Sequence, residues 1–272
     1  MTSGDELTVT ILGSGTSTGV PVPGCRCAVC DSEDPRDRRT RCSALVTWRG
    51  RNILFDTATD LRQQALREQL SHIDAVLFTH THADHVHGID DLRTFSRPGR
   101  PPLPVFAAAE SLATLRRVFA YIFSEPAQPG YRPNLAAWTV AGPFLLFGLP
   151  VQPVTLAHGT GTSLGYRLGP MAYLTDCSAI PATAERHLQN LDLLIIDALR
   201  FRPHATHFNI AEAIAAARRL GARRTLLTHL SHEVAHARDD RGLPDGFELA
   251  YDGQTIRLPF ARQIHWDEAL SG

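Results

Sequence analysis

The sequence predicts a single α/β domain that spans residues 1–272. Apolar segments of strand length alternate with segments of helical periodicity along the chain. Several strand-like segments are rich in Val, Ile and Leu, which is typical of strands buried on both faces. The 272 residues contain no low-complexity linker and no shift in composition that would mark a second domain.

The first half of the chain is expected to begin with a strand. The run LTVTIL alternates as a strand does and leads into the glycine-rich loop GSGTSTG, and two later apolar runs flank the turn RGRN, which predicts a hairpin. The expected elements are strands at 7–12, 44–48, 53–56 and 73–78, a helix at 59–70 with Thr57 or Thr59 as its N-cap, a helix or turn at 88–93, a strand at 105–107, a helix at 110–123 and a loop at 124–133.

The second half is expected to contain short strands with two helices among them. The strands are expected at 144–147, 151–157, 163–168, 171–175, 193–196 and 224–228, and the helices at 181–188 and 210–220. Asn209 and Gly221 are the expected cap and stop of the second helix. Two runs at 247–251 and 255–258 surround the turn residues Asp252 and Gly253, which predicts a closing hairpin.

The densest set of metal-binding side chains is the segment THTHADH at 79–85, directly after an apolar strand. His80 and His82 can turn toward one ion, whereas Asp84 and His85 can face a second. Imidazole and carboxylate donors suit Zn, Mn or Fe, and two ions ~3.5–4 Å apart can clamp a phosphoryl or acyl oxygen. The alternative is a solvated loop that is rich in His by chance, which is at odds with only 13 His in the whole chain.

Further donors stand at the ends of other strands. His158, Asp176 and His229 each follow an apolar run. Such residues are usually turn residues, but here they fall where a second set of ligands is required, and an Asp can bridge two cations through its two oxygens. Asp56 also ends a strand, and is either an acceptor that orients a ligand histidine or a strand-end cap.

Three thiols lie within six residues, at Cys25, Cys27 and Cys30. They need a fourth donor to close a tetrahedral zinc site, and a distant His could supply it. The alternative is a set of reduced cysteines without a ligand. The first six residues show no basic or apolar signal region, so we expect a cytoplasmic location, where disulfides are rare.

Composition excludes several classes of function. All 27 basic residues are Arg, so Schiff-base chemistry and a Walker-type lysine are ruled out. A net charge of −1 gives no electrostatic reason to bind nucleic acid or a membrane surface, and no apolar stretch approaches the length of a membrane span. Thr18 replaces the last glycine of a dinucleotide-binding loop, so the glycine-rich loop is better explained as a tight turn at the active-site rim.

Taken with the later donors, the motif HTHADH resembles the ligand set of the dinuclear metallo-β-lactamase superfamily in order and residue type. The resemblance covers most of the chain. It implies a four-layer αββα sandwich, the metallo-β-lactamase fold, with the metals at one edge between two sheets. The implied ligands are His80, His82 and His158 for one ion, Asp84, His85 and His229 for the other, and Asp176 as the bridge.

Within this superfamily the chain is similar to the PhnP-type phosphodiesterases, because the glycine-rich loop leads into CRCAVC and a His follows three residues after His229. The similarity implies a structural zinc site in a small loop at 25–30 of the same domain. Its ligands would be Cys25, Cys27, Cys30 and His232. Cys42 and Cys177 are then expected to be small buried residues. His207 corresponds to the His that these enzymes use near the phosphate as a general acid, the alternative being a residue that caps or packs against the next helix.

The resemblance implies a metal-dependent phosphodiesterase that acts on small or cyclic phosphodiesters, such as a ribosyl 1,2-cyclic phosphate or a 2′,3′-cyclic nucleotide. A hydroxide between two divalent ions (Zn, Mn or Fe) would attack phosphorus, Asp84 would serve as ligand and catalytic residue, and His207 would protonate the leaving oxygen.

Other readings stay open at this point. Two enzyme classes share the fold: tRNA 3′-processing endonucleases and thioester or lactone hydrolases. A non-catalytic zinc-binding module is a further alternative, but it would lack some of the seven ligands, and all seven are present. Homodimerisation is open, as are substrate contacts from Arg93, Tyr131 and Arg132.

Overall fold

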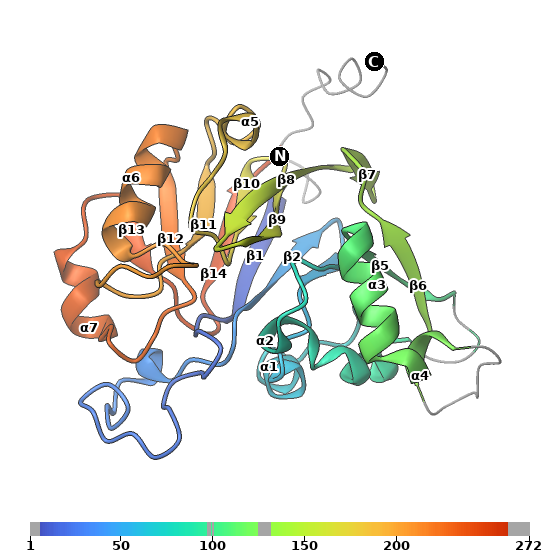
Figure 1. Ribbon diagram of the computed structural model, residues 1–272, viewed down its shortest axis with the longest axis horizontal. Coiled ribbons are helices and arrows are strands. Elements are labelled where there is room, and N and C mark those ends of the chain that lie inside the picture. Colours follow the sequence, from blue (N-terminus) through green and yellow to red (C-terminus); the bar gives the residue numbers. More distant parts are fainter. Residues whose placement is uncertain (1–5, 97–98, 100, 125–131, 261–272) are drawn as a thin grey trace.

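The computed structural model describes residues 6–96, 99, 101–124 and 132–260. Within them the chain forms two seven-stranded β-sheets that pack face to face, with helices on the outer face of each sheet (Figure 1). The expected four-layer αββα sandwich is confirmed.

The first sheet is built mainly from the first half of the chain. Its strands are β1 (Glu6–Gly13), β2 (Ser43–Trp48), β3 (Arg51–Phe55), β4 (Ala75–Leu77), β5 (Leu103–Ala107), β6 (Leu135–Thr139) and β14 (Thr255–Pro259). Their order is β14-β1-β2-β3-β4-β5-β6. The pairs from β14 to β3 are antiparallel, including the expected β2–β3 hairpin, and the pairs from β3 to β6 are parallel.

The second sheet comes entirely from the second half. Its strands are β7 (Phe144–Leu146), β8 (Leu149–His158), β9 (Gly161–Leu168), β10 (Met171–Leu174), β11 (Leu193–Asp197), β12 (Arg224–Thr228) and β13 (Phe247–Leu249). Their order is β13-β12-β11-β10-β9-β8-β7, with parallel pairs from β10 to β13 and antiparallel pairs from β7 to β10.

Helices cover both outer faces. The α-helices are α1 (Leu61–Arg67), α2 (Ala83–Val86), α3 (Ala109–Val118), α4 (Ala120–Phe123), α5 (Ala182–Glu185), α6 (Ile210–Leu220) and α7 (His236–Asp239), and the 3₁₀-helices are η1 (Pro35–Asp37), η2 (Ile89–Thr94) and η3 (Asp240–Gly242). Side chains of α1, α3 and α4 share a core cluster with the first sheet, and those of α5 and α6 share one with the second.

The core strands are apolar on both faces because each face meets a different layer. In β11, Leu193 and Ile195 point into the core between the sheets, whereas Leu194 and Ile196 pack against α6. Burial of one such side chain contributes ~1.5–3 kcal/mol. Phe55 and Tyr173 stack across the two sheets, with ring centroids 4.6 Å apart.

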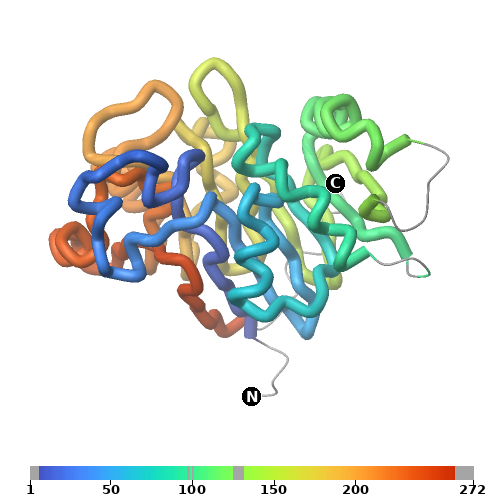
Figure 2. The backbone as a smooth tube through the Cα atoms, turned by 90° about the horizontal axis from the view of Figure 1, so that it is seen from below, coloured from blue at the N-terminus to red at the C-terminus, as the bar shows by residue number. Residues whose placement is uncertain are grey.

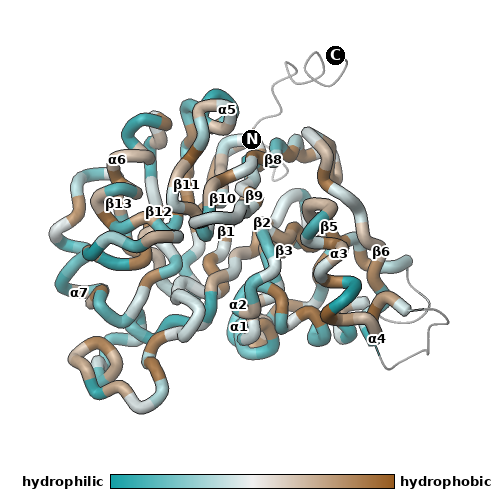
Figure 3. Tube along the Cα trace, in the orientation of Figure 1, coloured by the Kyte–Doolittle hydropathy of each residue, from teal (hydrophilic) through white to brown (hydrophobic). Residues whose placement is uncertain are grey.

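Helix α6 shows how local sequence sets an element's limits. Asn209 caps its start and Gly221 ends it with a φ of 67°, as the sequence predicts, and Glu212 completes a capping box with Asn209. Along α3, which has no side-chain cap, Figure 3 shows hydrophobic and hydrophilic segments, as expected for a helix with one face on a sheet.

The predicted closing hairpin is wrong. β13 pairs in parallel with β12 and β14 pairs antiparallel with β1, so the turn at Asp252 and Gly253 carries the chain from one sheet to the other. The carboxylate of Asp252 accepts hydrogen bonds from the backbone N–H groups of Ser14 and Thr40, which fixes this crossing to the first sheet.

Two helix predictions also need correction. The N-cap of α1 is Asp60 rather than Thr57 or Thr59. The helix expected at 110–123 is two helices, because Phe119 has φ −111° and ψ 45°, outside the α-helical region. Among the described residues, no helix has the length and apolar character needed to cross a membrane.

Candidate metal centres

Loops after four strands bring the expected donors to one edge of the sandwich. β4 leads into residues 79–85, β8 ends at His158, and Asp176 and His229 follow β10 and β12. β4 belongs to the first sheet and the other three strands to the second. The site therefore exists only where the two sheets meet.

The donors form two sets, and within each set one ligand atom from every side chain lies within 4.8 Å of the others. The first set is His80, His82, His158 and Asp176, and the second is Asp84, His85 and His229. These are the groupings that the resemblance implies.

Asp176 lies between the two sets. Its Oδ1 is 3.1 Å from Nε2 of His85 and 3.4 Å from Nε2 of His229. Its Oδ2 is 3.6 Å from Nε2 of His80 and 3.7 Å from Nε2 of His158. Each carboxylate oxygen thus faces a different set, which is the arrangement that a bridging ligand requires.

The buried nitrogens test whether metal ions fit this site. The Nε2 atoms of His80, His85 and His229 are buried and have no hydrogen-bond partner in the described part of the chain. A buried polar group without a partner costs ~1–3 kcal/mol, and a cation that accepts these lone pairs would remove that cost. Because imidazole and carboxylate donors suit Zn, Mn or Fe, the residues fit two divalent ions.

Hydrogen bonds behind the rings fix which nitrogen faces the site. Asp56 accepts from His85 Nδ1 at 2.7 Å and from Thr79 Oγ1 at 2.8 Å. Since the single hydroxyl proton of Thr79 goes to Asp56, Thr79 Oγ1 accepts from His80 Nδ1 at 3.0 Å. Both rings are left with Nε2 free to bind a metal. Asp56 was expected either to orient a ligand histidine or to cap the end of a strand. In the structure it accepts the hydrogen bond that orients His85.

Charge in the site favours cation binding. Burial alone would raise the pKa of Asp176, but His229 and His85 hold that pKa well below its usual range. Burial lowers the pKa of His80, which keeps it neutral. Burial also opposes a proton on His229, but Asp176 and Asp84 raise its pKa to about 9. A bound cation would replace that proton, so metal binding should release protons.

The backbone is strained at three of these residues. Asp56, Asp176 and His229 have φ values of 58°, 55° and 60°, in the left-handed region that non-glycine residues rarely adopt. Each such residue costs ~1–3 kcal/mol and persists where the surrounding structure holds it. Each follows the end of a strand, so the turn directs the side chain toward the site.

His207 approaches the donors from the loop after β11. Its Nδ1 donates to Oδ2 of the fully buried Asp197 at 2.7 Å, and its Nε2 is 3.9 Å from Oδ2 of Asp176. The same loop holds His158, whose Nδ1 donates to the carbonyl oxygen of Thr206 at 2.8 Å. Asn209, not His207, caps α6. The sequence predicts only an apolar strand at 193–196 here, and it gave no sign that Asp197, the next residue, would contact His207.

A cavity of about 920 Å³ lies over the donors. Its walls include Ser17 from the glycine-rich loop, Glu110, Ser111 and Thr114 from α3, and the tip of the β8–β9 hairpin. Figure 2 shows α3, this hairpin and the loop after β11 along one edge of the molecule. The sequence did not identify these α3 residues as part of the cavity, because their segment shows only the periodicity of a helix that packs one face against a sheet.

Substrate contacts from Arg93, Tyr131 and Arg132 were left open by the sequence. Among the described residues that line the cavity, neither Arg93 nor Arg132 is present. Arg93 pairs with Asp90, and Arg132 donates to the carbonyl oxygens of Tyr121 and Ser124. Tyr131 is outside the described residues.

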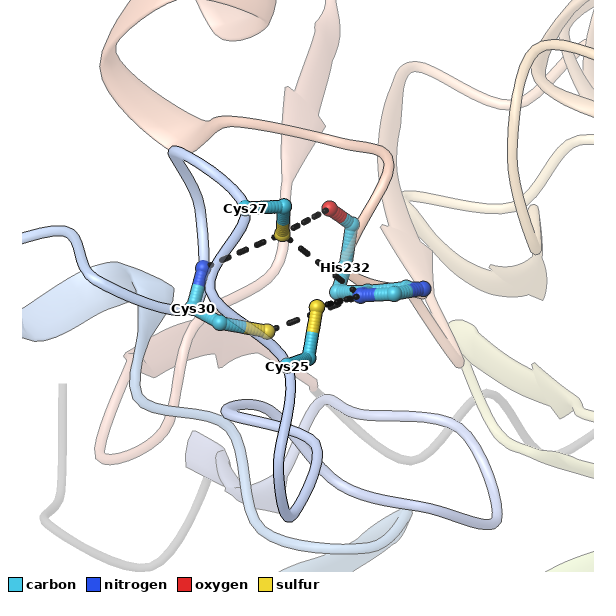
Figure 4. Close-up of side chains that lie close together, drawn as sticks. All are labelled: Cys25, Cys27, Cys30 and His232. Atoms are coloured by element: carbon cyan, nitrogen blue, oxygen red, sulfur yellow. Dashed lines mark hydrogen bonds between the residues drawn. The ribbon is translucent and has the colours of Figure 1, made fainter.

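The three clustered thiols converge on His232 (Figure 4). The Sγ atoms of Cys25, Cys27 and Cys30 lie 3.3, 3.6 and 3.5 Å from His232 Nδ1. Three sulfurs and one imidazole nitrogen at this spacing fit a closed tetrahedral zinc site. The backbone N–H of Cys30 helps lower the pKa of Cys27 to about 6, so one thiolate is favoured even without a metal. Cys42 and Cys177 are buried, as expected.

We expect Asp56→Asn to weaken divalent-ion binding at the second donor set roughly 10–100-fold, because His85 loses the carboxylate that orients it. Competition with a chromogenic chelator measures the affinity. Asp192→Asn is the matched control, since among the described residues the Asp192 side chain forms only a surface pair with Arg223. An unchanged affinity in a folded Asp56→Asn protein would show that Asp56 does not orient the ligand.

We expect Cys27→Ser to lose one bound zinc per chain, measured by elemental analysis, and to lower the melting temperature, because closed zinc sites stabilise folding. Cys177→Ser removes a buried thiol outside the cluster and should keep the zinc content of the wild type. Equal zinc in Cys27→Ser and the wild type would rule out the thiol cluster as a zinc site.

Comparisons with known proteins agree with this geometry. A family model described as "Beta-lactamase superfamily domain" matches residues 51–230. A solved structure, a new diphosphatase from the PhnP family, is 42% identical, covers 94% of this chain and 99% of its own, and superposes with a TM-score of 0.88.

Curated relatives carry other names. An octanoyltransferase of Porphyromonas gingivalis is 42% identical over 89% of this chain, but the chain spans only 50% of that protein. The coenzyme PQQ synthesis protein B of Methylorubrum populi is 29% identical over 70% of this chain and 72% of its own length. The ribonuclease Z of Salinibacter ruber is 29% identical over 72% of this chain and 81% of its own length.

Three findings support one assignment: the αββα sandwich, the order of the donors where the two sheets meet, and these matches. The chain belongs to the beta-lactamase superfamily and, within it, to the PhnP family.

Proposed function

We propose that this hydrolase cleaves a P–O bond in small phosphate diesters, with ribosyl 1,2-cyclic phosphates or 2′,3′-cyclic nucleotides as the favoured class. The observation that carries the proposal is Asp176, whose two oxygens face two separate donor sets, with His207 Nε2 3.9 Å from one of them. A PhnP-family relative named a diphosphatase supports chemistry at phosphorus.

Two divalent ions, when bound by the two donor sets, would polarise the phosphoryl oxygens and make water acidic enough to act as a nucleophile. Zn, Mn or Fe would suit these donors, and a further Zn would suit the thiol cluster. Asp84 and Asp176 keep their negative charge in the buried site because their pKa values are held well below the usual range. Asp84 thus serves as both ligand and electrostatic partner of the reaction.

His207 has the geometry of a general acid. The bond from Nδ1 to Asp197 orients the ring and leaves Nε2 exposed to the cavity, where a leaving oxygen can take its proton. Asp197 also accepts from the backbone N–H of Cys177 at 3.0 Å, so the carboxylate is itself held in place. It acts through His207 and is a positioning residue.

Two alternatives of the same fold are less well supported. The ribonuclease Z relative favours tRNA 3′-processing, but no Arg is among the described residues that line the cavity, and the net charge is −1. The octanoyltransferase relative favours acyl chemistry, but the described lining is made of His, Asp, Glu, Ser, Thr and Gly and includes no aliphatic side chain such as Leu, Ile or Val to hold an acyl chain.

We propose the cytoplasm as the location. The described cysteines are free thiols, and three of them are arranged as metal donors rather than as disulfides, which suits a reducing compartment. The proposed partner is a small phosphodiester, and no membrane or nucleic acid is required.

We expect Asp176→Ala to abolish hydrolysis of 2′,3′-cyclic AMP and of bis-p-nitrophenyl phosphate, since it removes the bridging ligand. His207→Ala should lower kcat for the cyclic nucleotide ~10²–10⁴-fold. The loss for bis-p-nitrophenyl phosphate should be much smaller, because p-nitrophenolate leaves without a proton. Steady-state kinetics on metal-loaded protein measures both.

His204→Ala is the matched control, because its ring centroid is 5.2 Å from that of His207 but it is not among the described cavity-lining residues. It should retain the wild-type ratio between the two substrates. Metal-loaded protein that hydrolyses thioesters or lactones but no phosphodiester would refute the proposal.

A further inference from the structure

Cys27 and Cys30 combine an accessible thiol with a buried one. Cys27 is partly exposed, whereas Cys30 is 3% exposed. The chain makes one helical turn between them, because the N–H of Asp31 donates to the carbonyl oxygen of Cys27 at 3.0 Å. The N–H of Cys30 donates to Cys27 Sγ at 3.4 Å. An accessible thiol beside a second, more protected thiol is the arrangement of a redox-sensitive pair.

The two thiols can close to a disulfide by rotation of their side chains. Their Sγ atoms lie within 4.8 Å of each other and converge on His232 (Figure 4). Residues three apart in a helical turn have Cα atoms ~5 Å apart, and disulfides join residues whose Cα atoms are ~4.4–6.8 Å apart. Cys42 and Cys177, by contrast, are fully buried and lie outside the thiol cluster.

We propose that Cys27 and Cys30 are a peroxide-sensitive modification site, and that their oxidation releases zinc from the thiol cluster and weakens ion binding by the second donor set. The thiolate is both the form that binds zinc and the form that attacks peroxide. With a disulfide in place, only Cys25 and His232 remain as donors, which is two fewer than a closed zinc site needs.

Hydrogen peroxide alone balances this oxidation. The Cys27 sulfur attacks one oxygen of the peroxide, the O–O bond breaks, and the departing hydroxide takes up a proton to become water. The Cys30 sulfur then attacks the sulfenic acid of Cys27, the S–O bond breaks, and a second water leaves. Two thiols lose two electrons to form one disulfide, and one peroxide is reduced to two waters. A thiol reductant reverses the step.

The segment that follows His229 transmits the change to the second donor set. His232 lies three residues after His229, and between them the N–H of Ser231 donates to the carbonyl oxygen of Leu199 at 2.9 Å. Leu199 begins the loop after β11, which carries His207. Because strand β12 also holds His229, the loss of affinity should be partial, on the order of tenfold.

The test treats protein that holds Zn in the thiol cluster and Mn²⁺ in the donor sets with hydrogen peroxide. Mn²⁺ does not suit thiolate ligands, so the two elements report on different sites. The protein should lose one zinc per chain, its free thiols should fall from five to three, and peptide mapping should locate the disulfide between Cys27 and Cys30. Electron paramagnetic resonance of free Mn²⁺ should show an affinity lower by roughly tenfold. Dithiothreitol and added zinc should restore the starting values.

Cys177→Ser is the matched control, because it removes a buried thiol outside the cluster and should keep both the zinc release and the loss of Mn²⁺ affinity. Cys30→Ser keeps the accessible thiol without its partner and should form no disulfide. Circular dichroism should show that the sheets of the oxidised wild type are still folded, so that unfolding does not account for the weaker Mn²⁺ binding.

Zinc and thiols that stay unchanged at a peroxide concentration that oxidises free dithiothreitol would overturn the proposal. Oxidation to a sulfonic acid that dithiothreitol does not reverse would also overturn it. Reversible zinc loss with an unchanged Mn²⁺ affinity, or with unfolded sheets, would overturn the coupling between the two sites. None of these measurements uses a substrate, so their result is independent of the proposed function.

Discussion

The constraint on which the structure depends is the buried carboxylate of Asp176. Only 2% of this residue is exposed, and a charge in such a place is very unfavourable unless opposite charge surrounds it. His85 and His229 supply part of that charge, and each comes from a different sheet. The strained backbone at Asp176 and His229 is consistent with this, because the packed sheets hold residues in a conformation that they would not adopt alone. Two divalent ions would replace the histidine protons and supply the compensating charge themselves.

The two candidate metal sites share one segment of chain. His229 belongs to the second donor set and His232, three residues later, to the thiol cluster. Between them, the N–H of Leu230 donates to Ser14 and its carbonyl accepts from Thr16, both in the glycine-rich loop, and buried Arg39 donates to the carbonyl oxygen of Ser231. A zinc in the thiol cluster would therefore fix the segment that carries His229, and the glycine-rich loop is part of that support rather than a nucleotide site.

Much of this arrangement could be read from sequence because it depends on local patterns. Apolar runs that end in a polar residue predicted β4, β10, β11 and β12 and most candidate metal donors. The residues that limit α6, Asn209 and Gly221, stand directly before and after its helical run. The predictions that were wrong or missing concern features that depend on long-range contacts. The last two strands resemble a hairpin in sequence, but β13 and β14 each find a better partner in a different sheet. Asp197 gains its contact with His207 only when the loop after β11 is folded over the site, and it has no local signal.

The most direct test of the account is the position of the bound ions. Crystals of metal-loaded protein, measured at the absorption edge of the metal, should show two anomalous peaks ~3.5–4 Å apart. One should lie among His80, His82 and His158 and the other among Asp84, His85 and His229, with one oxygen of Asp176 bound to each. A single ion at this edge of the sandwich, or two ions with Asp176 bound to only one, would contradict the account.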